Sequence, residues 1–212
     1  RDRELDGRKE TFQELVQKGL GGFLVRNMES YGILDAMGLT SRIVLDANIY
    51  TMNNRAEAFW MKKGILGDTV PLELNAKELV HRNNKNSELT VYGYTPMMVS
   101  VQCVQKTMDH CNHACVQYVL KDRYQKEFRG VCSCEFCYNT IYNTLPTSLL
   151  KEKEKAEKLG VKAYRLSFTT ETQQETEKIV RAFVDVYLRG QKPDGQMQTE
   201  ETTKGHFQRG VE

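Results

Sequence analysis

RIVLDANIYTMNNRAEAFWMKKG, residues 42–64, shows the strand–helix unit that recurs along this chain. Its first part, 42–48, is a short apolar run and predicts a buried strand, while 54–64 predicts a helix that ends at Gly64. Because apolar strands separated by helices are typical of parallel sheets, we expect the strands to be parallel neighbours in chain order. Similar apolar runs predict five strands in all, at 22–26, 42–46, 69–74, 89–93 and 163–168.

The number of strand–helix units leaves two α/β architectures open. Five units fall short of the eight that close a (β/α)8 barrel, so the residues fit either an open sheet or the later part of a TIM-like barrel. No GxGxxG or GxxxxGK[ST] motif follows a predicted strand, which argues against a nucleotide phosphate site.

The composition is that of an ordinary globular chain. Its 212 residues carry a net charge of +2, which is too balanced to indicate nucleic acid or a membrane surface. No apolar run approaches the ~20 residues of a membrane span. The charged start, RDRELDGRKE, has no signal-peptide core and no initiator Met. We therefore expect a cytoplasmic protein, without a membrane partner, of which this chain is one segment.

All six cysteines lie between Cys103 and Cys137, inside the segment 102–143. Small secreted proteins spread their cysteines to staple a weak core, whereas this chain gathers its thiols locally. Metal binding is therefore the preferred interpretation, and disulfides are the lesser one. The strongest motif is the CEFC of residues 134–137, because two intervening residues let both thiolates turn onto one metal.

Four cysteines are the predicted metal ligands: Cys103, Cys111, Cys134 and Cys137. Cys115 lies in an apolar run and is expected to pack into the core. Cys132 is expected to be too close to Cys134 for both to bind one centre. Four thiolates serve either zinc or an iron–sulfur cluster, and His110 and His113 also allow a mixed zinc site.

A catalytic or substrate pocket is predicted at the carboxyl ends of the strands, where parallel α/β folds bind ligands. Arg26 and Glu73 end apolar runs, and Tyr92 and Tyr94 lie at the end of another. We expect Arg26 to hold an anionic group, Glu73 to orient it or exchange a proton, and the tyrosines to contact the substrate. The simpler alternative is an Arg26–Glu73 ion pair that satisfies two strand ends.

Several stretches of the chain resemble one known family. ELTVYGYTPMMVSVQCV (88–104), CEFCYNTIYNTLP (134–146) and VRNMESYGIL (25–34) are similar to the collagenase-like peptidases, peptidase family U-thirty-two. The likeness extends over nearly all of the chain and several separate motifs.

The signature of that family is only partly kept. Glu88 and Gly93 match it, but Tyr92 takes a histidine position. Pro96 takes the position of the first signature cysteine, and only the second, Cys103, is present. The resemblance therefore implies a branch in which one ligand has moved, with Cys111 as the expected substitute.

The resemblance also implies a fold and a function. The chain would be the C-terminal part of a longer protein, the later part of a (β/α)8 barrel, with the region preceding it as a partner. Members of the family are implied to carry a [4Fe-4S] cluster. Some are described as collagen-degrading peptidases, and others as acting in the hydroxylation of RNA bases or quinone precursors, so the implied substrate is a protein, a peptide or RNA.

The residues by themselves keep three classes of function open. No HExxH, GxSxG or paired-aspartate motif is present, so proteolysis rests on the resemblance alone. An iron–sulfur protein acting on RNA would use a basic face, for which 121–129 with Tyr124 is the candidate. The third class is a structural zinc clip on an interaction module. The expected organisation is barrel units at 1–101, the cysteine segment at 102–143, a last strand–helix unit at 144–190 and a polar tail at 191–212.

Overall fold

The computed structural model of the chain describes residues 2–108, 111–193 and 201–210. Contacts group the described residues into two compact units, each assembled from segments that are distant in sequence. The first unit draws on Arg1–Thr90, Glu154–Tyr164 and His206–Glu212. The second unit draws on Val91–Lys153 and Arg165–Gly205.

A mostly parallel sheet carries the five predicted strands. Its order is β1-β2-β3-β4-β10, and β9 pairs antiparallel with β4. The first four strands are parallel neighbours in chain order, as predicted, with Phe23 opposite Ile43 and Thr69 opposite Glu88 in the register. The strands are β1 (Phe23–Val25), β2 (Ile43–Leu45), β3 (Gly67–Thr69), β4 (Ser87–Gly93), β9 (Thr147–Ser148) and β10 (Ala163–Ser167).

The third predicted strand, 69–74, is wrong in its bounds. Strand β3 ends at Thr69, and a turn follows at residues 72–73. Pro71 explains the early end, because proline has no N–H to give to a sheet. Within the described residues the path from β1 to β10 is an open sheet, and no closed barrel is formed.

Helices cover the sheet of the first unit and form its core with β1 and β2. The core holds Val25, Ile43 and Leu45 from the strands, with Leu34 and Trp60 from two helices. Asn27 caps α2 and Asn53 caps α3 by accepting backbone N–H groups, which fixes where each helix begins. The helices are α1 (Asp2–Gln17), α2 (Met28–Ala36), α3 (Asn54–Lys62), α4 (Ala76–Val80), α5 (Val104–Thr107), α6 (Lys153–Glu157) and α7 (Gln173–Phe183).

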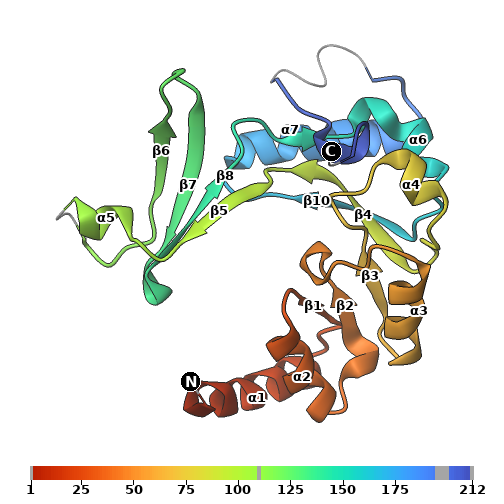
Figure 1. Ribbon diagram of the computed structural model, residues 1–212, viewed down its shortest axis with the longest axis horizontal. Helices are drawn as coiled ribbons and strands as arrows, with labels where there is room; N and C mark the ends of the chain where they lie inside the picture. Colours follow the sequence, from red (N-terminus) through yellow and green to blue (C-terminus); the bar gives the residue numbers. More distant parts are fainter. Residues whose placement is uncertain (1, 109–110, 194–200, 211–212) are drawn as a thin grey trace. The chain divides into compact units, whose positions relative to one another are not determined.

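The cysteine segment folds as a second, antiparallel sheet, shown in green in Figure 1. The order is β5-β8-β7-β6, so β5 and β6 are the edge strands. Strands β6 and β7 form a hairpin in which Gln117 lies opposite Val131 and Lys121 opposite Glu127. This hairpin contains the basic stretch 121–129. The bounds are β5 (Pro96–Ser100), β6 (Gln117–Lys121), β7 (Glu127–Ser133) and β8 (Tyr138–Tyr142).

The last predicted helix is present in the second unit. Helix α7 begins with a capping box, in which the side chains of Thr172 and Glu175 each accept the other's backbone N–H. Its helical turns continue as a π-helix over Val184–Leu188, and Phe183 and Val186 are buried.

No helix in the described part of the chain is both long and apolar enough to cross a membrane.

Candidate metal centre

Three cysteine sulfurs come together beside the antiparallel sheet. The Sγ atoms of Cys103 and Cys132 lie 3.7 Å apart, and those of Cys132 and Cys134 lie 3.6 Å apart. Cys103 directly precedes α5, Cys132 lies in β7, and Cys134 begins the 3-10 turn Cys134–Phe136. Two different parts of the fold therefore supply the thiols of this sulfur group, Cys103, Cys132 and Cys134.

The sulfur group contains two of the four predicted ligands, together with Cys132, which is not one of them. The sulfurs of Cys103 and Cys134 each lie within 3.7 Å of the Cys132 sulfur. Cys132 and Cys134 lie close together, with 3.6 Å between their sulfurs, and the expectation that they cannot both bind one centre stays a prediction. Residues two apart in extended chain point to the same side, so the Cys132-Ser133-Cys134 spacing presents both sulfurs to one space. That periodicity is a signal that the sequence contains.

The other cysteines lie at the surface. Cys111 and Cys137, both predicted ligands, are exposed. Cys115 is exposed as well, so the prediction that it packs into the core is wrong. The physical reason is that β6 begins only at Gln117, which leaves Cys115 in the irregular chain before the strand. His110 lies outside the described residues.

The CEFC turn holds two cysteines at its ends. The backbone N–H of Cys137 donates to the carbonyl of Cys134 at 3.3 Å, and Cys137 adopts a left-handed conformation with φ 52°. The thiol of Cys134 donates to the carbonyl of Ala114 at 2.9 Å. The chain before β6 therefore passes close to Cys134.

The two buried thiols of the sulfur group differ in acidity. A hydrogen bond from the backbone N–H of Lys106 lowers the pKa of Cys103, although burial acts in the opposite direction. Burial raises the pKa of Cys132 to about 12, and its contacts with the thiols of Cys134 and Cys103 add to this rise. Cys103 is thus the more acidic of the two buried thiols.

The sulfur atoms of Cys103, Cys132 and Cys134 are suitable ligands for a thiophilic metal, but they do not form a complete metal site. Among the described residues, no group of three or more His, Cys, Asp or Glu side chains has the geometry of one. Two thiolates on one tetrahedral ion with bonds of about 2.3 Å lie roughly 3.8 Å apart. The observed sulfur separations of 3.7 Å and 3.6 Å are close to that value.

Arg26 and Glu73, the predicted catalytic residues, have different surroundings in the first unit. Arg26 forms its ion pair with Asp46, at 3.0 Å from Nε to Oδ2, and lies 3.4 Å from the Asn48 side chain. The ion pair of Arg26 is therefore with Asp46 rather than with Glu73. Glu73 is half-buried, and its Oε2 atom is buried without a hydrogen-bond partner.

Tyr92 and Tyr94, the predicted substrate contacts, are buried in the second unit. The Tyr92 ring lies 5.5 Å from that of Phe168 and 6.2 Å from that of Phe183. The guanidinium of Arg129 lies 4.9 Å from the centre of the Tyr94 ring. Both tyrosines contribute to packing, and a substrate role for them stays a prediction, as do the roles of Arg26 and Glu73.

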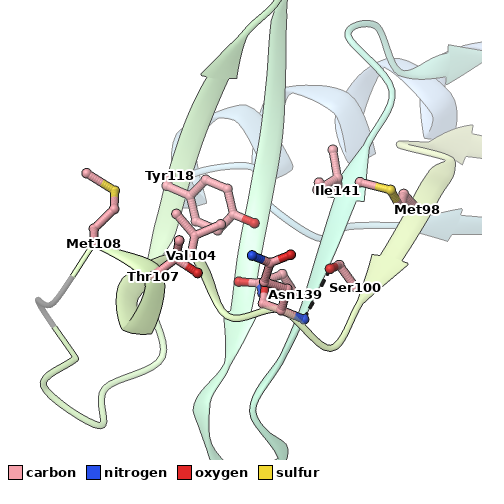
Figure 2. A pocket seen from close by; sticks show the side chains of 9 residues that line it. Met98, Ser100, Val104, Thr107, Met108, Tyr118, Asn139 and Ile141 are labelled. Carbon is pink, nitrogen blue, oxygen red and sulfur yellow. Dashed lines mark hydrogen bonds between the residues drawn. The ribbon is translucent and has the colours of Figure 1, made fainter.

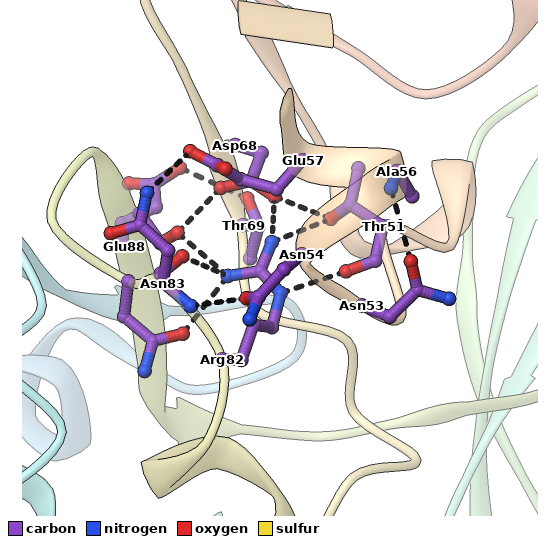
Figure 3. A network of polar contacts seen from close by, with 12 residues as sticks. Thr51, Asn53, Asn54, Ala56, Glu57, Asp68, Thr69, Arg82, Asn83 and Glu88 are labelled. Atoms are coloured by element: carbon purple, nitrogen blue, oxygen red, sulfur yellow. Dashed lines mark hydrogen bonds and ion pairs between the residues drawn. The ribbon is translucent and has the colours of Figure 1, made fainter. Parts of the chain in front are cut away.

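A buried polar network in the first unit was not found from the sequence (Figure 3). Asp68, in β3, accepts hydrogen bonds from Thr51, Arg82 and Ser87. Arg82 also donates to the backbone carbonyl of Thr51 at 2.8 Å and to Asn84 Oδ1 at 2.9 Å. The network ties β3 to the chain before α3 and after α4. The sequence does contain one signal of this network, the charged residue Asp68 within the short strand β3.

A pocket of about 250 Å³ lies on the antiparallel sheet (Figure 2). Asn139 of β8 and Tyr118 of β6 present polar atoms to it, and α5 closes one side. The Tyr118 ring lies over Gly130, where an added Cβ would be only 2.3 Å from it. The lining residues are Met98, Ser100, Gln102, Val104, Thr107, Met108, Tyr118, Asn139 and Ile141.

No protein-family model, no curated protein and no solved structure matches this chain.

Proposed function

We propose that this chain is the C-terminal part of a cytoplasmic protein resembling the collagenase-like peptidases, and that its cysteine segment binds a [4Fe-4S] cluster. The observation that carries the proposal is that Cys103 and Cys134, two of the proposed ligands from distant places in the sequence, both lie within 3.7 Å of the Cys132 sulfur. Free thiols have no need to gather in this way, whereas a thiolate-bound centre requires it.

The cluster would be held by Cys103, Cys111, Cys134 and Cys137. A four-iron cluster is much bulkier than one ion and takes one cysteine on each iron, so its ligands must surround an open space. Cys111 and Cys137 are exposed and lie on a loop and a turn. Cys132 is fully buried inside β7, where its backbone pairs with Asn139, and it would lie behind the cluster. When bound, such a cluster supplies electron transfer or an iron that activates a substrate.

A single zinc ion is the second candidate, and the sulfur spacing favours it. The sulfur pairs Cys103–Cys132 and Cys132–Cys134 have the separation of two thiolates on one tetrahedral ion. Cys137 would be the fourth ligand, from the same turn as Cys134. In this case the segment would be a structural clip, since a closed set of four thiolates leaves no position for a substrate.

The resemblance supports an enzyme, for which we propose two activities. The first is peptide hydrolysis. The second is hydroxylation of an RNA base or a quinone precursor, supported by the cysteine segment rather than by a hydrolytic motif. In either case Arg26 would hold an anionic group of the substrate and Glu73 would move a proton. The strands of the parallel sheet would then be the later part of a (β/α)8 barrel that the preceding region completes.

Anaerobic purification followed by metal and sulfide analysis tests the proposal. We expect a brown protein with about four iron and four sulfide per chain, and a broad visible absorbance that bleaches on reduction. Cys103→Ser and Cys134→Ser should abolish the colour, while Cys115→Ser, an exposed cysteine outside both ligand sets, should keep it. A colourless protein with one zinc per chain establishes the second candidate, and a protein without either metal overturns both.

A further inference from the structure

The pocket on the antiparallel sheet contains two buried polar atoms that have no partner. The hydroxyl of Tyr118 and the Oδ1 atom of Asn139 are both buried without a hydrogen bond, and both residues line the pocket. Figure 2 shows the Tyr118 hydroxyl pointing toward the Asn139 amide. Since each atom lacks a partner, they do not bond to each other. Leaving a buried polar atom unpaired is unfavourable, so two such atoms in one pocket point to a ligand.

The fold holds both side chains in place. Asn139 is 0% exposed, and its Nδ2 donates to the backbone carbonyl of Gln102 at 2.8 Å. Because the atom that donates to this carbonyl must be Nδ2, the other end of the amide is Oδ1, and this oxygen has no partner among the residues that the structure describes. Tyr118 packs flat over Gly130, its cross-strand partner, and this contact requires a residue without a side chain. The two polar atoms are therefore presented rigidly.

The lining defines the class of ligand. No lining residue is charged, so a charged ligand would be buried without a counter-charge, at high cost. Met98, Met108 and Ile141 provide apolar walls, and methionine side chains adapt to different shapes. Asn139 Oδ1 can only accept a hydrogen bond, while the Tyr118 hydroxyl can donate one. The volume of about 250 Å³ is several times the ~30 Å³ share of one water and suits a small molecule.

We propose that this pocket binds a small neutral amide with an apolar body, whose N–H donates to Asn139 Oδ1 and whose carbonyl accepts from the Tyr118 hydroxyl. An amide presents a donor and an acceptor side by side, which matches the two unpartnered atoms. The apolar body would lie against Met98, Met108 and Ile141. None of the lining residues is itself a proposed metal ligand, although Gln102 and Val104 flank Cys103.

Methyl NMR of the full chain labelled with 13C-methyl methionine tests the site, with benzamide as the probe. Met98 and Met108 line the pocket from β5 and from the end of α5, so their signals report its occupancy. Met61, in the core of the first unit, is the internal control. We expect benzamide to shift the Met98 and Met108 signals in a saturable way. Benzoate, which is charged, and N,N-dimethylbenzamide, which lacks the donor, should bind at least several-fold more weakly.

Tyr118→Phe separates ligand binding from packing. The variant removes only an unpartnered hydroxyl, so it should fold normally and bind benzamide about fivefold more weakly, the ratio of one neutral hydrogen bond. Tyr124→Phe, on the exposed tip of the same hairpin, is the matched control and should bind as the unaltered protein does. The proposal is overturned if benzamide shifts neither methionine signal, if the three probes bind equally, or if Tyr118→Phe binds benzamide without loss.

Discussion

The guanidinium of Arg82 and the carboxylate of Asp68 form an ion pair in the interior of the first unit, with side chains that are 2% and 3% exposed. Thr51 and Ser87 donate to the same carboxylate. Every charge in this pair is therefore compensated by a partner, which is the condition under which buried ions persist.

Arg82→Met should destabilise the protein by about 3–5 kcal/mol, because it leaves the Asp68 carboxylate buried without its counter-charge. The free energy of unfolding from urea denaturation measures the loss. The matched control is Arg181→Met, which breaks an exposed ion pair with Glu177 and should cost no more than about 0.5 kcal/mol. A similar loss in both variants would contradict a structural role for the buried pair.

Two glycine substitutions should have opposite effects on stability. A Cβ at Gly67 would lie 2.2 Å from the backbone carbonyl oxygen of Asn86, so Gly67→Ala must displace β3 or the chain beside it. Gly32 lies inside α2 with open space around it, so Gly32→Ala should stabilise the protein by about 0.5–1 kcal/mol. Thermal unfolding of the two variants checks both signs, and a stable Gly67→Ala protein would refute the packing described for β3.

Cys111→Ser and Cys132→Ser distinguish the two proposed metal centres. A cluster on Cys103, Cys111, Cys134 and Cys137 should be lost in Cys111→Ser and kept in Cys132→Ser. A zinc ion on the sulfur group should show the reverse pattern, because Cys132 is then a ligand. Iron, sulfide and zinc content after anaerobic purification gives the answer, and retention of metal in both variants would exclude both ligand sets.

Alkaline pH should destabilise the first unit through Tyr31. Burial raises the pKa of Tyr31 above its ordinary value of 10.0, and the charge of Asp35 raises it further. The folded state thus holds this proton more tightly than the unfolded state. Its contribution to stability is complete below pH 10.0 and is lost as the pH rises through the folded pKa.

Tyr31→Phe removes that contribution and tests it. Its free energy of unfolding should fall less steeply than that of the unaltered protein between about pH 9 and pH 11. At neutral pH it should lose no more than about 1 kcal/mol, the value of one contact between the Tyr31 hydroxyl and Asp35. Tyr124→Phe, at an exposed tyrosine, should follow the unaltered protein at every pH.

Glu73→Gln should leave stability unchanged while it tests the proposed proton transfer. The Oε2 atom of Glu73 is buried without a partner, so a neutral amide of the same shape removes no hydrogen bond from that atom. In the full-length protein, lost turnover with an unchanged melting temperature supports the catalytic role. Full turnover per folded molecule assigns Glu73 no part in the reaction.

Local signals in the sequence were sufficient for most of the parallel sheet. The apolar runs around Val25, Ile43 and Val91 have the length and composition of buried strands, and the order of β1 to β4 follows from the strand–helix alternation. The predicted end of β3 is too late because the apolar residues around Pro71 favour a strand that the proline cannot continue. Propensity is local, whereas the end of a strand depends on which N–H groups are available to the neighbouring strand.

The antiparallel sheet was not predicted from the sequence, because its pairing of β5 with β8 joins strands that are distant in the sequence and leaves no local signal. Cys132 is predicted to lie too close to Cys134 for both to bind one centre, and the two sulfurs lie 3.6 Å apart. The contact between Cys103 and Cys132 joins residues 29 positions apart and could not be read from spacing. The ion pair between Asp68 and Arg82 could not be predicted either, because nothing in the sequence shows which buried acidic residue pairs with which buried basic residue.

The discontinuous composition of the first unit affects how the protein is made on the ribosome. Its strands β1 to β3 leave the ribosome early, but residues 206–210 also belong to the unit, and Gly210 lies against Asn75. Roughly 120 residues separate Thr90 from Gly210, and at 5–20 residues per second their synthesis takes about 6–24 s. During this interval the partly built unit exposes apolar surface without its last segments. The first unit therefore completes its packing only after nearly all of the second unit has been synthesised.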